Sequence, residues 1–240
     1  MKPEYISKPD WEILIHKYPD HKWLEQKLQS GYPPQYLIGN VEFLNTKILV
    51  DERVLIPRFE TETLVDNTIK YAHTIFSKSL NILDLGTGSG CIAISLKKNL
   101  DATVTAIDIS CEALEVAKKN AQINNVNIKF INQNMTDSLI NYYDIIISNP
   151  PYIPKDGFVE QKVKDYEPNL ALFAEDDGLY FYKTIITKHW SHLNKPGLMA
   201  FEIGEHQKEK LEKMLQLQKL HYVFQNDLQG LPRYLFIFNE

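Results

Sequence analysis

Apolar and polar residues follow two different periods along the chain, and the changes of period divide it into parts. Between residues 11 and 28 the apolar positions recur at intervals of three and four, with a break at Pro19-Asp20 and an end at Gly31. Such intervals place apolar side chains on one face of a helix. They predict two short amphipathic helices in an N-terminal helical segment, residues 1–32.

The following stretch has the shorter period that is typical of strands. Three runs rich in β-branched and aromatic residues are separated by short polar pairs and end before Pro57: 41–44, 47–50 and 53–56. This pattern predicts a β-hairpin or small meander within a linker, residues 33–60. Apolar residues then return to intervals of three and four, which predicts a helix from Thr61 to about Ser77.

From about residue 80 onward, apolar strand-like runs alternate with amphipathic helical stretches. Such alternation predicts an α/β fold whose sheet is largely parallel and is covered by helices on both faces. The runs HYVFQ and YLFIFN near the C-terminus have only the loop NDLQGLPR between them. We therefore expect an antiparallel C-terminal hairpin at the sheet edge, within a main domain of residues 61–240.

Composition narrows the class of protein. A chain of 240 residues with 44% hydrophobic residues can bury a substantial core. Its formal net charge of −5 argues against direct nucleic-acid binding as its main role. No apolar run approaches the ~20 residues that span a bilayer, and the start lacks a secretory signal, so we expect a cytoplasmic protein without a membrane partner. Cys91 and Cys111 are expected to be buried apolar residues, and no metal site is predicted.

A glycine-rich loop, DLGTGSG, joins the strand-like run NILDL to a predicted helix. Glycines there permit positive φ angles and let the backbone approach a ligand closely. The spacing is G-x-G-x-G, and neither the dinucleotide motif G-x-G-x-x-G nor a P-loop lysine is present, which disfavours pyrophosphate. A nucleoside-like ligand is favoured, and a tight turn without a ligand is the alternative. The candidate cofactor-binding residues in this loop are Gly86, Thr87, Gly88, Ser89 and Gly90.

An acidic residue ends the next strand-like run, TVTAID, about twenty residues later. The Asp108 carboxylate can accept both hydroxyls of a ribose, although it could instead cap the helix that begins near Ser110. The glycine loop and this acid together resemble the S-adenosylmethionine pocket of class I methyltransferases. That resemblance implies that Asp108 holds the ribose, and that Asn134 and Met135 lie where the adenine is positioned, with Asn134 in place of the usual acid. We therefore include Met135 among the cofactor-binding residues.

The segment SNPPYIP directly follows a long apolar run. Ligands of parallel α/β sheets bind beyond the carboxyl ends of the strands, so Asn149 is expected beside the cofactor. The Asn149 side-chain oxygen and the Pro150 carbonyl could accept hydrogen bonds from a planar NH₂ group, while Tyr152 offers an aromatic face and Pro150 and Pro151 make the turn rigid. A turn that merely ends the strand is the alternative. The residues favour a planar amino group as the substrate.

The Asn-Pro-Pro-Tyr motif resembles that of methyltransferases acting on planar amino groups. Over roughly residues 33–205 the chain also resembles the HemK/PrmC family, the glutamine N5-methyltransferases of peptide-chain release factors, in the segments QYLIGNVEF, VLIPRFETETLVD, ILDLGTGSGCIAISL, SNPPYIP, YEPNLALFAEDDGLYFYK and FEIG. This resemblance implies methyl transfer from S-adenosylmethionine to the side-chain amide of the glutamine in the Gly-Gly-Gln loop of class 1 release factors. It also implies the catalytic residues Asn149, Pro150, Pro151 and Tyr152, within a methyltransferase domain at 61–240.

Phe59 replaces a proline of the family in the segment RFETE, and Glu60 and Glu62 could line the active-site rim, begin a helix, or do both. The main alternative function is methylation of a nucleobase exocyclic amino group on DNA or RNA, which shares the Asn-Pro-Pro-Tyr chemistry. The acidic balance and the family-specific segments disfavour it. A cofactor-binding interaction protein without catalysis is a third possibility, which a broken pocket would favour.

Overall fold

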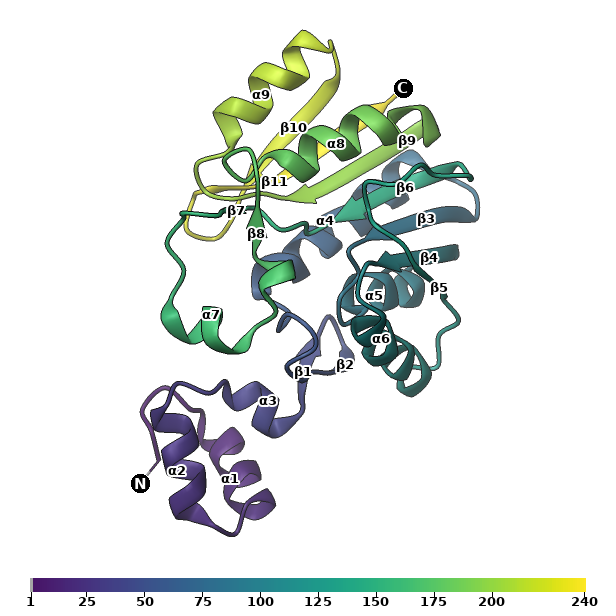
Figure 1. Cartoon of the computed structure of the whole chain (residues 1–240). Coiled ribbons are helices and arrows are strands. Elements are labelled where there is room, and N and C mark those ends of the chain that lie inside the picture. Colours follow the sequence, from purple (N-terminus) through teal and green to yellow (C-terminus); the bar gives the residue numbers. More distant parts are fainter. Residues whose placement is uncertain (1) are drawn as a thin grey trace.

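A computed structural model describes residues 2–240 of the chain. Its N-terminal part is a small helical lobe, seen below the sheet in Figure 1. The Ser7 and Asp20 side chains cap the first two helices by accepting hydrogen bonds from backbone amides inside them. The lobe has a small apolar core of its own: Ile6, Leu14, Leu24, Leu28 and Leu37. The two predicted helices are present and a third follows: α1 (Lys8–Lys17), α2 (His21–Gln29) and α3 (Pro34–Ile38).

An antiparallel hairpin follows the lobe, with strands β1 (Asn40–Phe43) and β2 (Thr46–Leu49). The predicted strand at 53–56 is wrong. There the backbone turns at Asp51, whose carbonyl accepts a hydrogen bond from the Val54 amide at 3.1 Å. Val54 is buried all the same. The run is apolar because its side chains pack in the core, not because its backbone pairs with another strand.

The central sheet of the described residues has seven strands in the order β10-β11-β9-β6-β3-β4-β5. Neighbouring strands from β5 to β9 are parallel, whereas β11 is antiparallel to both β9 and β10. The predicted fold class is therefore confirmed, including the antiparallel C-terminal hairpin. The strands are β3 (Leu80–Leu85), β4 (Ala102–Asp108), β5 (Lys129–Asn132), β6 (Tyr143–Ser148), β9 (Leu193–Glu202), β10 (His221–Asn226) and β11 (Pro232–Asn239).

Helices cover both faces of this sheet, and the strands alternate between two apolar cores (Figure 1). In β6, Ile145 and Ile147 pack on one face and Ile146 on the other, as the two-residue period of a strand requires. The buried Cys91 fits its prediction, but Cys111 is exposed where a helix begins, so that prediction is wrong. One face carries α4 (Phe59–Ile75), α5 (Cys91–Asn99) and α6 (Cys111–Ile123), and the other carries α8 (Tyr180–His189) and α9 (Lys208–Leu217).

The segment after β6 leaves the sheet and returns to it before α8. It contains a short parallel pair, β7 (Ile153–Pro154) and β8 (Phe173–Ala174), and the helix α7 (Gln161–Tyr166). The Tyr166 hydroxyl donates to the Ser30 carbonyl at 3.2 Å, so this segment touches the N-terminal lobe. Single 3₁₀ turns lie at Asn169–Ala171 and Trp190–His192.

Two further findings concern residues 2–240 as a group. None of their helices is long and apolar enough to cross a membrane. Their His, Cys, Asp and Glu side chains also form no group of three or more that could hold a metal ion.

Candidate active site

Strand register brings the candidate residues to one edge of the sheet. Parallel pairing sets Leu85 level with Ile107, and Ser148 level with Phe201, while β3 pairs with β6 between these two pairs. The next residue along each strand then lies at the carboxyl end or just past it, where α/β sheets bind ligands. These neighbouring residues are Asp108, Gly86, Asn149 and Glu202.

The glycine loop needs its glycines for two different reasons. Gly86, Gly88 and Gly90 have φ angles of +72°, +52° and +83°, a region that side chains disfavour. A Cβ atom on Gly86 would lie 2.6 Å from the Met135 Cε atom, so a larger residue there would push the end of the Met135 side chain aside. A Cβ atom on Gly88 would meet nothing within 4 Å. Gly88 therefore borders open space that a ligand could fill.

The loop's two polar side chains face the protein. Thr87 and Ser89 are both buried, and the Thr87 hydroxyl donates to Asp84 Oδ2 at 2.6 Å. The Ser89 carbonyl accepts from Asn120 Nδ2 at 2.8 Å, and Asn120 also bonds both backbone groups of Leu49 in the hairpin. Burial raises the pKa of Asp84 to about 7. Thr87 and Ser89 thus fix the loop's shape, and any contact they make with a ligand would come from their backbone.

Asp108 faces the loop. Its Oδ2 atom accepts from the Gly88 amide at 2.8 Å and its Oδ1 atom from the Ser110 amide at 2.9 Å. Burial raises the pKa of Asp108, while these backbone hydrogen bonds oppose the rise. The N-cap of α6 is Ser110, whose side chain accepts from the Ala113 amide, so Asp108 is not the cap. Each carboxylate oxygen retains acceptor capacity for a ligand hydroxyl.

Asn134 and Met135 lie on the loop after β5. Asn134 Oδ1 accepts from the backbone amide and hydroxyl of Thr136, so its oxygen closes its own turn. The Met135 carbonyl lies 2.8 Å from His189 Nε2 of α8, and the Met135 side chain packs beside Gly86. Met135 therefore meets the glycine loop, while the Asn134 oxygen is engaged locally.

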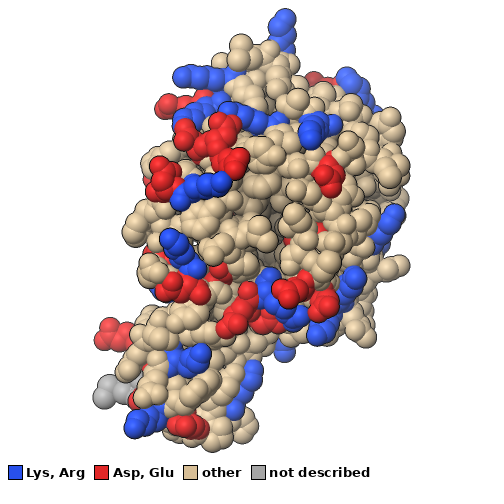
Figure 2. Space-filling view, viewed as in Figure 1, with Lys and Arg blue, Asp and Glu red and all other residues tan. Residues whose placement is uncertain are grey.

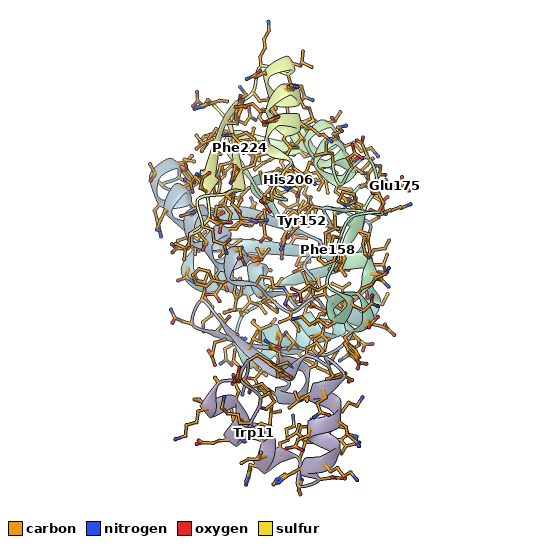
Figure 3. All side chains as sticks on the ribbon, turned by 90° about the vertical axis from the view of Figure 1, so that its left-hand side faces the viewer. Trp11, Tyr152, Phe158, Glu175, His206 and Phe224 are labelled. Atoms are coloured by element: carbon orange, nitrogen blue, oxygen red, sulfur yellow. The ribbon has the colours of Figure 1, made fainter. Side chains whose placement is uncertain are left out.

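A small cavity opens beside the Asn-Pro-Pro-Tyr turn. Figure 2 shows a hollow near the middle of this face, surrounded mainly by uncharged residues. In Figure 3 Tyr152 lies near the centre of the molecule, far from Trp11 of the N-terminal lobe. Four separate stretches of the chain supply the walls: Leu55 and Arg58; Asn149, Tyr152 and Ile153; Ala171 and Leu172; and Glu202.

Hydrogen bonds link the side chains at the base of this cavity. Asn149 Nδ2 donates to Thr61 Oγ1 at 3.0 Å, and the Thr61 hydroxyl donates to Glu202 Oε2 at 2.7 Å. The Tyr152 hydroxyl lies 3.4 Å from Glu202 Oε1. The hydrogen bonds of residues 2–240 leave Asn149 Oδ1 and the Pro150 carbonyl without a donor. Both can therefore still accept a hydrogen bond.

Buried charge accompanies this network. Burial raises the pKa of Glu202 to about 7, with the hydrogen bond from Thr61 and the charge of Arg233 opposing the rise and the charge of Glu60 adding to it. Burial also raises the pKa of Tyr152 well above its usual value, and the Glu202 charge adds to that rise. Tyr152 is therefore a neutral phenol at physiological pH.

The backbone of the turn is held on both sides. Pro150 and Pro151 are buried. The Tyr152 carbonyl accepts from Gln207 Nε2 at 2.9 Å, and a Cβ atom on Gly178 would lie only 2.0 Å from the same carbonyl oxygen. The turn is consequently fixed by packing as well as by its prolines.

Several site residues were not predicted individually. Thr61, Glu167, Glu202 and Arg233 had no assigned role, although three of them lie in segments that carried the family resemblance. Glu167 forms an ion pair with the cavity residue Arg58, and Arg233 donates to the Ile203 carbonyl at 3.1 Å. Glu202 directly follows the apolar run GLMAF. A carboxylate at the end of a buried strand is the sequence feature that could have identified it as a site residue.

Solved structures share this fold. A crystal structure of a methyltransferase from Pyrococcus furiosus superposes with a TM-score of 0.58 at 17% identity, covering 92% of this chain and 97% of that one. The family model for the methyltransferase small domain matches residues 61–165. The sheet order and the carboxyl-edge site therefore define a class I S-adenosylmethionine-dependent methyltransferase fold.

Curated relatives give the family. A release factor glutamine methyltransferase from Lactococcus lactis is 45% identical over 220 residues, which is 88% of this chain and 80% of the relative. Another with that name from Flavobacterium psychrophilum is 41% identical and covers 97% of this chain and 81% of the relative. The chain belongs to the release factor glutamine methyltransferase family.

Proposed function

We propose that this protein transfers a methyl group from S-adenosyl-L-methionine to the side-chain amide nitrogen (N5) of the glutamine in the Gly-Gly-Gln loop of class 1 peptide-chain release factors. Family membership supports the reaction. The observation that carries it in this chain is that Asn149 Oδ1 and the Pro150 carbonyl lack donors in a turn whose Asn149 lines the cavity, at the sheet edge that also carries the glycine loop.

The residues proposed to hold the cofactor fit a nucleoside. The space beside Gly88 is open, and the Asp108 oxygens can each accept one more hydrogen bond. When bound, S-adenosylmethionine supplies a methyl group made electrophilic by a positively charged sulfur. The proposed cofactor-binding residues are Gly86, Thr87, Gly88, Ser89, Gly90, Asp108, Met135 and Asn149.

The proposed catalytic residues orient a poor nucleophile. An amide nitrogen shares its lone pair with its carbonyl and is therefore a poor nucleophile. It would become positively charged as its bond to the methyl group forms and the methyl–sulfur bond breaks, with S-adenosylhomocysteine as the leaving group, and it would then lose one N–H proton to water. Asn149 Oδ1 and the Pro150 carbonyl would each accept a hydrogen bond from one N–H group of the substrate amide, and both oxygens would stabilise the positive charge on its nitrogen. Tyr152 offers a flat face to the amide plane, and the buried Pro150 and Pro151 keep the acceptors in place.

The proposed partner is a protein loop rather than a nucleic acid. We assign the chemistry mainly to residues 61–240, and assign residues 1–32 and 33–60, which add Leu55 and Arg58 to the cavity wall, to positioning the release factor. The two parts are in contact through Tyr166. It lies in the segment that returns to the cavity wall, and its hydroxyl hydrogen-bonds Ser30 of the N-terminal lobe. Release factors act in translation termination, so we place the activity in the cytoplasm.

The test uses purified protein, methyl-labelled S-adenosylmethionine and a class 1 release factor. We expect one labelled methyl group per release factor, on the loop glutamine, and none on a release factor carrying a Gln→Ala change in that loop. Label on the altered release factor would contradict the proposed target. Label on a DNA or RNA duplex, with none on the release factor, would instead support a nucleobase substrate.

A further inference from the structure

The Asn149 side chain is one end of a hydrogen-bonded chain that ends on a buried acid. Its Nδ2 atom bonds Thr61 Oγ1, and Thr61 bonds Glu202 Oε2, at 3.0 and 2.7 Å. The three residues come from the turn after β6, the first turn of α4 and the end of β9. Thr61 is 3% exposed and Glu202 is 2% exposed, so water cannot easily replace either bond.

Donation along this chain runs in one direction. A threonine hydroxyl carries a single proton, and an ionised carboxylate can only accept. The Thr61 proton therefore goes to Glu202, and Thr61 can only accept from Asn149. The atom of Asn149 that faces Thr61 must be Nδ2, which leaves Oδ1 as the acceptor.

Packing alone would not make this choice. The oxygen and the nitrogen of a carboxamide have nearly the same size, and only the hydrogen-bond network distinguishes the two orientations. A flipped Asn149 would point its NH₂ group at the substrate's NH₂ group and set donor against donor. The orientation of one amide therefore decides whether the site attracts or repels the group to be methylated.

We propose that Glu202, acting through Thr61, is a positioning residue that fixes the Asn149 amide with Oδ1 toward the substrate amide. This inference rests on the proposed function and adds to it two residues outside the Asn-Pro-Pro-Tyr motif. The Glu202 carboxylate makes the Thr61 hydroxyl donate to it, and Thr61 must therefore accept from Asn149.

The ionised form of Glu202 is the form that sets this direction. The charged groups around the Glu202 carboxylate are Arg233 from β11 and Glu60 from α4, and its hydrogen-bonding neighbours are the hydroxyls of Thr61 and Tyr152. Tyr234 of β11 lies opposite Glu202 in the sheet, and Tyr182 donates to the Glu202 backbone carbonyl. Arg233 favours the carboxylate and Glu60 opposes it. A protonated Glu202 could donate to Thr61, which would free Thr61 to donate to Asn149 and reverse the chain.

The first experiment compares Thr61→Val with Thr61→Ser in full-length protein. Valine keeps the shape of threonine without the hydroxyl, whereas serine keeps the hydroxyl. We expect kcat to fall at least tenfold in Thr61→Val while KM for S-adenosylmethionine stays within twofold, and we expect Thr61→Ser to retain at least half of the wild-type kcat. A Thr61→Val enzyme with wild-type kcat would overturn the inference.

Glu202→Gln provides a second test should Thr61→Val fold poorly. Wild-type kcat is expected to fall as the pH drops below about 7, because Glu202 becomes protonated. This acid limb should be absent from Glu202→Gln. The same limb in both proteins would assign it to another group and overturn the role of Glu202.

A measurement without substrate separates this inference from the proposed function. The side-chain NH₂ of Asn149 in ¹⁵N-labelled protein should exchange slowly with water in wild type and Thr61→Ser, and rapidly in Thr61→Val. Equal exchange in all three proteins would mean that the chain does not hold the amide. A wild-type protein with the expected exchange but no methylation of the release factor would instead refute the proposed function.

Discussion

The two sides of the crevice are built from different parts of the chain. The side proposed to bind the cofactor is mainly backbone: Gly86 and Gly88 with positive φ angles, and backbone amides bonded to Asp108. The substrate side is mainly side chains, in which Asn149 depends on Thr61 and Thr61 on Glu202. The first side is assembled within adjoining strand ends, and the second from segments that lie far apart in the sequence.

This difference predicts how each side fails. A backbone-built site is altered by substitutions that change the path of the chain or fill the space beside it, and the loss appears as weaker ligand binding. A site built from linked side chains loses its geometry when a single atom is removed, and the loss appears in turnover. Substitutions on the two sides should therefore affect different kinetic constants.

The largest expected effect is that of Asn149→Ala on turnover. Alanine removes one of the two proposed acceptors, and the loss of one preorganised group at a developing charge costs about 100-fold or more in kcat. S-adenosylmethionine binding, measured by calorimetry, should change much less. Equal losses in kcat and in cofactor affinity would mean that Asn149 acts in cofactor binding. The two sides of the crevice would then not affect different kinetic constants.

The next largest effect is on stability, and here the substitution Glu202→Gln is expected to make the protein more stable. The pKa of Glu202 is raised from 4.5 to about 7, so the folded protein binds this proton more tightly than the unfolded chain. The stability from that proton is complete below pH 4.5 and is lost as the pH rises through 7. Glutamine stays neutral, so Glu202→Gln should exceed wild type in unfolding free energy by on the order of 3 kcal/mol at pH 8.

Denaturant unfolding from pH 5 to pH 8 measures this gain. It should shrink toward pH 5, and Glu205→Gln, an exposed neighbour, serves as the matched control. Parallel curves for wild type and Glu202→Gln would show that the buried acid does not cause the pH dependence. A variant that is more stable yet slower would show that Glu202 is retained for function at a cost in stability.

Sequence patterns brought the glycine loop and Asp108 together but did not relate Thr61 to Glu202, and sequence separation explains why. The glycine loop and Asp108 lie on adjoining strands whose periods and turn residues are local features. Thr61 and Glu202 are 141 residues apart, and no periodicity relates a threonine in one helix to an acid at the end of a distant strand. Only the sheet register, which pairs β6 with β9, brings Glu202 beside Asn149.

Two errors have local causes. The run at 53–56 has the composition of a strand because its apolar side chains are buried, although its backbone forms a turn and an extended stretch. Cys111 was expected in the core because cysteine is commonly buried, but it starts α6 on the exposed side. At 53–56 the apolar composition reflects buried side chains and not a strand. At Cys111 the type of residue does not show on which side of the helix it lies.

The smallest expected effects are those of alanine substitutions at two glycines on the proposed cofactor side. Comparing the two separates a loss of stability from a loss of cofactor binding. Gly86→Ala and Gly88→Ala each place a side chain at a positive φ angle, which costs about 1 kcal/mol. Only at Gly86 would the added methyl group also collide with Met135, so Gly86→Ala should be the less stable of the two in thermal unfolding. At Gly88 the methyl group would enter the open space, so the loss of stability should stay near that cost of about 1 kcal/mol while the Kd for S-adenosylmethionine rises. Unchanged cofactor binding by Gly88→Ala would mean that the cofactor does not occupy that space.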